Sequence, residues 1–75
     1  MNLYTAMKEL KPGIFIRFKG HDEEQKIKEV REGIRYHKFW NKYVVTVRDR
    51  LGKNGIVFLE EILEVINEKK INIEE

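Results

Sequence analysis

This sequence lacks the residues that several kinds of chemistry need, since it has no cysteine, no serine and only one proline. Without cysteine there can be no disulfide bond, no thiolate zinc site and no cysteine nucleophile. Without serine, every serine hydrolase is excluded. A chain of 75 residues is also too short for two independent cores, so one small domain is expected over residues 1–75.

Long hydrophobic runs are absent as well. No apolar stretch approaches the roughly 20 residues of a membrane helix, and no basic region followed by an apolar segment marks a secretory signal. The sequence therefore predicts a cytoplasmic protein with no membrane partner, from a bacterium, an archaeon or a virus that infects one. It does not indicate an oligomeric state.

Charge is plentiful and unevenly distributed. Charged residues make up 37% of the chain, above the roughly 25% typical of soluble domains. Residues 26–53 hold nine basic and three acidic side chains, whereas residues 54–75 hold two basic and six acidic ones. This pattern predicts either ordinary solvated faces or a dipolar surface that attracts an anionic partner.

The N-terminal residues predict a helix over residues 1–11, ended by Pro12 and Gly13. A sheet region is expected over residues 13–59, and its first strand follows Gly13 with alternating apolar residues from position 14 to 19. The helix has an apolar stripe at i, i+3, i+4 and i+7, formed by Leu3, Ala6, Met7 and Leu10.

Residues 21–33 fit two structures. Asp22 followed by Gln25 resembles a helix capping box, and Gly33 suits the position after a helix end. The apolar residues Ile27, Val30 and Ile34 have helical spacing, but they also fit a strand with one bulge. Both interpretations stay open.

The most strand-like segment of the chain runs from Tyr43 to Val47, where β-branched residues alternate. Asn54 and Gly55 then favour a type I′ hairpin turn, because both residue types accept positive φ angles. Residues 56–58 form the returning strand. The residues expected to fill the core are Ile14, Ile16, Phe18, Val45, Val47, Ile56, Phe58, Ile62 and Ile66.

The last part of the chain predicts a C-terminal helix over residues 59–69. Its apolar residues recur at helical spacing, and its acidic residues precede its lysines, as the helix dipole favours. Residues 71–75 are expected to fray.

Three phrases, ELKPGIFIRFKG, YVVTVRD and GKNGIVFLEEILEVI, make residues 10–66 similar to small SH3-like β-barrels. The chain differs from those barrels in a long charged connection over residues 20–41 and in a final segment with helical spacing. The resemblance implies a mainly β fold with terminal helices, built as a small SH3-like antiparallel barrel or twisted sheet. The alternative is an α+β antiparallel meander with two or three flanking helices.

No motif in the sequence indicates catalysis. His21 stands beside three acidic residues, an arrangement that suits a solvated loop better than a cation site. His37 has no neighbouring acid that would orient it as a base, and the glycines form no phosphate-binding loop. The sequence therefore predicts a protein that is not an enzyme and that has no cofactor and no metal.

The most informative segment runs from Arg35 to Tyr43, with four aromatic side chains, three permanent cations and a histidine. Bases stack on aromatic rings, and Lys and Arg neutralise phosphates. The same residue types dominate protein contacts and also fill cores. Because Trp40 falls at the expected bend before Tyr43, we expect it to be at least partly exposed.

The sequence thus favours a non-catalytic module that binds nucleic acid. The alternative is a protein-interaction or inhibitor module, such as a small phage or viral protein that blocks a host factor. The residues expected to contact the nucleic acid or protein partner are Arg31, Arg35, Tyr36, Lys38, Phe39, Trp40, Lys42, Arg48 and Arg50.

Overall fold

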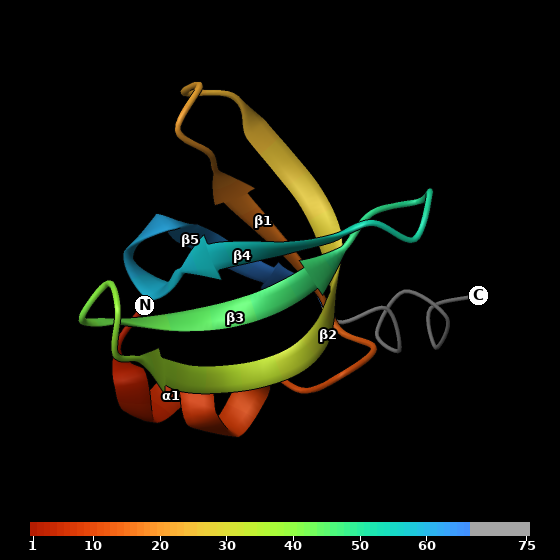
Figure 1. Ribbon diagram of the computed structural model, residues 1–75. Coiled ribbons are helices and arrows are strands. Elements are labelled where there is room, and N and C mark those ends of the chain that lie inside the picture. Colours follow the sequence, from red (N-terminus) through yellow and green to blue (C-terminus); the bar gives the residue numbers. More distant parts are fainter. Residues whose placement is uncertain (67–75) are drawn as a thin grey trace.

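Antiparallel strands dominate the computed structural model, which describes residues 1–66. The elements of this part are α1 (Leu3–Glu9), β1 (Phe15–Lys19), β2 (Gln25–His37), β3 (Lys42–Arg48), β4 (Asn54–Phe58), the 3-10 turn η1 (Leu59–Glu61) and β5 (Ile62–Ile66). The strands form one sheet in the order β4-β3-β2-β1-β5. Figure 1 shows this sheet curled, with β1 and β5 behind β3 and β4. The predicted mainly β fold class is confirmed, and the alternative with several flanking helices is wrong for residues 1–66.

The helix α1 packs on the inner side of the sheet, below β2 and β3 in Figure 1. The Asn2 side chain caps it by accepting a hydrogen bond from the Thr5 backbone N–H at 2.8 Å. Ala6 and Leu10 are buried in the core. Leu10 approaches β2 at Gly33, where an added Cβ would lie 2.8 Å from the Leu10 carbonyl oxygen. A glycine is therefore required where the helix crosses the strand.

Residues 25–37, whose structure the sequence left open, form the long strand β2. Its pairing with β3 is irregular twice, between Val30 and Glu32 and again between Glu32 and Arg35. Such bulges bend a strand and change which side chains face the core. Val30 is buried and Ile34 packs against the same core, whereas Ile27 is exposed. The helical spacing of these three residues therefore does not reflect a shared buried face.

The C-terminal helix predicted over residues 59–69 is wrong for its described part. Residues 59–61 form η1, and Ile62–Ile66 form β5, which pairs with β1. The Glu61 carboxylate accepts a hydrogen bond from the Phe58 N–H at 2.9 Å, which fixes this tight turn. The free edge of β1 then outweighs the helical pattern, because tertiary pairing overrides local propensity. Residues 67–69, and residues 71–75 that were expected to fray, lie outside the described part.

The predicted Asn54-Gly55 hairpin turn is also wrong. These two residues belong to β4, opposite Arg48 and Val47. The turn lies earlier, where the Asp49 carboxylate accepts hydrogen bonds from the Leu51 and Lys53 N–H groups, both at 2.9 Å. Gly52 supplies the positive φ of 83°. An aspartate that bonds to the following backbone therefore sets the hairpin.

The core differs from the predicted set in β4. Val57 lies opposite Val45 and is buried, whereas Ile56 and Phe58 lie opposite Thr46 and Val44. Opposite residues of an antiparallel pair share one face of the sheet. Ile56 and Phe58 are thus not core residues, and they point away from α1. Ile14 and Ile66 are half-buried, and the remaining predicted members are buried: Ile16, Phe18, Val45, Val47 and Ile62.

Candidate functional site

The candidate site lies on the face of β2, β3 and β4 that points away from the core, called here the outer face. Alternation along paired strands assigns its members. They are Glu29, Glu32, Arg35, His37, Lys42, Val44, Thr46, Arg48, Asn54, Ile56 and Phe58.

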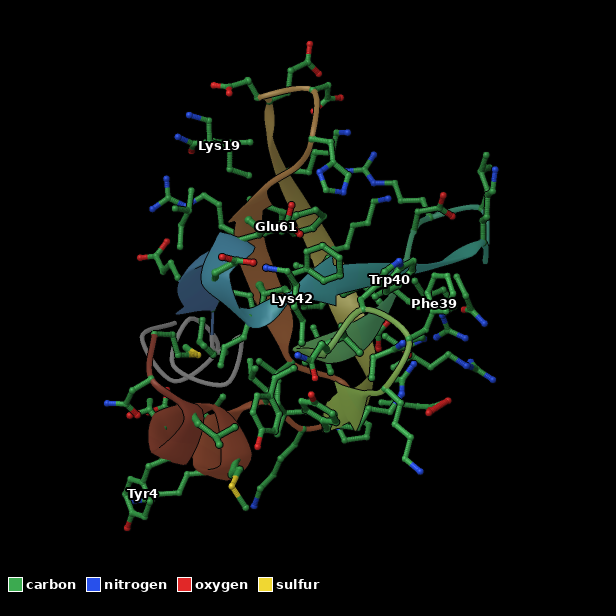
Figure 2. The ribbon with its side chains drawn as sticks, turned by 60° about the vertical axis from the view of Figure 1, so that its left-hand side comes forward. Tyr4, Lys19, Phe39, Trp40, Lys42 and Glu61 are labelled. Carbon is green, nitrogen blue, oxygen red and sulfur yellow. The ribbon has the colours of Figure 1, made fainter. Side chains whose placement is uncertain are left out.

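An aromatic cluster covers one end of the outer face. The indole of Trp40, in the turn after β2, stacks on His37 with ring centres 4.6 Å apart and planes at 25°. It meets Phe58 edge-on at 5.4 Å and Phe39 at 6.0 Å. Trp40 is 43% exposed, which confirms its predicted exposure, and Phe39 is 83% exposed. Figure 2 shows the two residues side by side, with Tyr4 of α1 well apart from them.

A hollow of about 360 Å³ opens beside this cluster. Trp40, Ile56 and Phe58 form its apolar wall. His21 reaches it from the β1–β2 loop and meets the Phe58 ring edge-on at 5.9 Å. Lys42 borders it, with its Nζ 5.3 Å from the Phe58 ring centre. The hollow thus combines flat apolar surfaces with a cation, which suits a planar ligand that carries negative charge.

The middle of the outer face is covered. Val44 is 0% exposed, although its side chain is not part of the main core. The Arg35 guanidinium donates a hydrogen bond to the Thr46 hydroxyl at 2.6 Å. Arg35 is therefore held against the sheet, halfway between the two ends of β3.

Carboxylates already neutralise some of the predicted cations. Lys42 forms an ion pair with Glu60, and Arg48 with Glu29 at 3.3 Å. In the described part, the exposed side chains Arg31, Lys38 and Arg50 form no ion pair. Exposed ion pairs contribute only about 0–1 kcal/mol, so a phosphate can compete for the paired cations.

A second hollow, of about 710 Å³, lies at the other end of β3. Lys28, Arg48 and Arg50 line it together with the apolar side chains of Ile27 and Leu51. Leu51 is 93% exposed. The nearby carboxyl of Asp49 is engaged by the loop: the Lys53 N–H lowers its pKa most, and the Leu51 N–H lowers it further. Cations thus outnumber carboxylates around this hollow.

The nine predicted contact residues do not form one surface. Tyr36 and Tyr43 lie opposite each other, with ring centres 5.2 Å apart, on the face that carries the core. They are partly exposed, but the sheet separates them from Trp40. Tyr36 therefore does not belong with the outer-face residues that the sequence grouped with it.

Sequence reasoning missed Phe58, Ile56 and His21 as members of the site. Phe58 and Ile56 could have been found from the pairing register of β4, because placing Val57 opposite Val45 makes Phe58 point outward. Nothing in the sequence placed His21 against Phe58, since that contact depends on how the β1–β2 loop folds.

Residues 1–66 contain no group of three His, Asp or Glu side chains arranged to hold a metal ion. Within the same residues, the structure has no helix of the length and apolar character needed to cross a bilayer. Comparison with protein-family models, curated proteins and solved structures finds no match.

Proposed function

We propose that this protein is a non-catalytic domain that binds single-stranded nucleic acid on the outer face. The observation that carries the proposal is the partly exposed Trp40 indole beside a hollow bordered by Phe58 and Lys42. Stacking of a base on an aromatic ring contributes about 1–3 kcal/mol. Lys38 and Lys42, which flank Phe39 and Trp40 in the sequence, would then meet the phosphates on either side of a stacked base.

A single strand fits this face better than a duplex. The exposed rings of Phe39 and Trp40 offer stacking surfaces, and bases within a duplex are already stacked on each other. A duplex would contact the cations of this face but would not stack on its aromatic rings. Within the proposal, Phe39 and Trp40 stack bases, and the residues that contact phosphate are Arg31, Arg35, Lys38, Lys42, Arg48 and Arg50.

We also propose that the fold is an SH3-like barrel. The sequence differs from such barrels in two segments, and the secondary structure of both segments is compatible with the proposal. The long connection over residues 20–41 consists mostly of β2, and the final helical pattern is the short strand β5. A cytoplasmic location, in a prokaryote or a virus that infects one, belongs to the same proposal.

A protein-binding module is the second candidate. It is favoured by the ion pairs of Lys42 with Glu60 and of Arg48 with Glu29, which reduce the positive charge of the outer face. The apolar wall of Ile56 and Phe58 would suit a hydrophobic side chain of a partner. The affinity for a protein partner that binds through such a side chain would depend little on salt.

The test uses Trp40, the only tryptophan of the chain, as a fluorescent reporter. Oligo-dT and oligo-rU of about 12 nucleotides are titrated at low and moderate salt, next to a duplex of equal length. We expect quenching by the single strands, with affinity that falls as salt rises. A Trp40→Ala variant, followed by anisotropy of labelled oligonucleotide, should bind at least about fivefold more weakly.

Tyr4→Ala is the matched control, because Tyr4 is exposed on α1, on the core side of the sheet. It should bind as the wild type does. Absence of binding at low salt, or equal binding by the Trp40→Ala variant, would exclude the proposal. Absence of oligonucleotide binding at every salt concentration would favour the protein-binding module instead.

A further inference from the structure

The two hollows lie on the same side of β3. Lys42 borders the hollow at Trp40, and Arg48 lines the hollow at the β3–β4 loop. Both side chains have even positions in a regularly paired strand, so both point to the outer face. Arg35 lies between them, bonded to Thr46. The outer face therefore carries cations along the whole length of β3, together with one acid, Glu32 opposite Thr46, that forms no ion pair in the described part.

From this arrangement we propose that a single nucleic-acid strand follows β3 from one hollow to the other. One base occupies the hollow at Trp40, and the phosphate chain passes Arg35 and Arg48 to reach Arg50. This inference rests on the proposed function and adds the path and the length of the bound strand.

The length of β3 sets the length of the site. Six residue steps separate Lys42 from Arg48, which corresponds to about 20 Å at the rise of a β-strand. One strand of a duplex advances about 3.4 Å along the helix axis per nucleotide, so at most about six nucleotides span this distance. A more extended strand would need fewer.

The hollow at the β3–β4 loop has the cationic and apolar side chains that the end of such a path requires. Arg50 forms no ion pair in the described part and can meet a phosphate. Ile27 and Leu51 add exposed apolar surface for a sugar or base. The facing acids are already engaged, since Glu29 pairs with Arg48 and Asp49 binds the loop backbone. A phosphate therefore meets little uncompensated negative charge there.

The experiment measures Trp40 quenching by oligo-dT of about 3 to about 12 nucleotides in the wild type, Arg50→Gln and Lys8→Gln. Lys8 is the matched control, because it is exposed on α1, which covers the core side of the sheet. We expect affinity to rise up to about six nucleotides and then to level off. For the longest strand, Arg50→Gln should reduce the salt slope by about 0.7 and leave the final quenching unchanged.

The Lys8→Gln variant should keep the wild-type slope. Equal slopes for Arg50→Gln and Lys8→Gln would overturn the path along β3 while leaving the site at Trp40 intact. Absence of quenching at every length would instead overturn the proposed function itself. The two failures are therefore distinguishable.

Discussion

The Trp40 indole lies nearly parallel to the His37 imidazole, 4.6 Å away, and this stack holds the turn after β2 against the outer face. The same indole touches Phe58 of β4. The partly exposed Trp40 side chain therefore links β2 and β4, the two strands that flank β3. Such a residue has both a structural and a binding role, and the two can be separated experimentally.

Replacing Trp40 by Ala should lower the free energy of unfolding by about 1–2 kcal/mol, because contacts between aromatic rings are lost. Phe18→Ala, which truncates a buried core ring, should cost about 3–5 kcal/mol. Chemical denaturation followed by circular dichroism measures both values without relying on tryptophan fluorescence. If the two variants lost equal stability, Trp40 would have to be treated as a core residue.

Gly33→Ala should destabilise the fold by about 1–3 kcal/mol, the usual cost of overpacking. The new Cβ would lie 2.8 Å from the backbone oxygen of Leu10, which cannot rotate away. Gly55→Ala is the control, since its Cβ would meet Val47 Cγ2 at an ordinary 3.9 Å. Thermal unfolding of the two variants tests the difference, and equal midpoints would refute a close approach of α1 to β2.

Asp49 should make stability depend on pH at the acid end. Its pKa is lowered from the ordinary 3.8 in the folded state, first by the Lys53 N–H. A lowered folded pKa means that the contribution is complete above the unfolded pKa and is lost as pH falls through the folded pKa. The wild type should thus exceed Asp49→Ala in stability near neutral pH, and the gap should close in strong acid.

Asp49→Asn provides the control for that experiment. Its amide oxygen can still accept the loop N–H groups, so it should retain much of the stability without the change in acid. Denaturation curves at a series of pH values measure all three proteins. A gap between wild type and Asp49→Ala that stayed constant into strong acid would contradict the role of the charge.

Removing the partner of Lys42 should strengthen nucleic-acid binding. Glu60→Gln frees the Lys42 ammonium beside the hollow and removes a negative charge, so affinity for oligo-dT should rise about two- to fivefold. Stability should change by less than about 1 kcal/mol, because the pair is exposed. Glu9→Gln on α1 makes the same charge change on the core side and should leave affinity unchanged. Weaker binding by Glu60→Gln would show that Glu60 itself contacts the ligand.

Local patterns predicted a strand and a helix that are each regular over their length. The alternation from Tyr43 to Val47 corresponds to β3, and the stripe from Leu3 to Leu10 corresponds to α1. The exposure of Trp40 followed from its place at a bend. In each case, the signal lies within a few neighbouring residues.

The failures come from interactions between distant segments. Residues 62–66 have helical spacing, but the edge of β1 makes them a strand. Phe58 reads as a core residue until the register with β3 turns it outward. The candidate site could not be predicted for the same reason, because its hollow at Trp40 depends on Phe58 from β4 and on His21 from a loop.

The pairing of β1 with β5 has a consequence for synthesis. Phe15 lies opposite Ile66, so one edge of an early strand is completed by the last described strand. A nascent chain can pair β1 with β2 soon after both emerge, but the other edge of β1 has no partner until residues 62–66 have left the ribosome. Unpaired edges invite contacts with other chains, and domains with such distant pairings fold slowly. This domain should therefore reach its native state only after residues 62–66 have emerged, and its most vulnerable interval falls just before that moment.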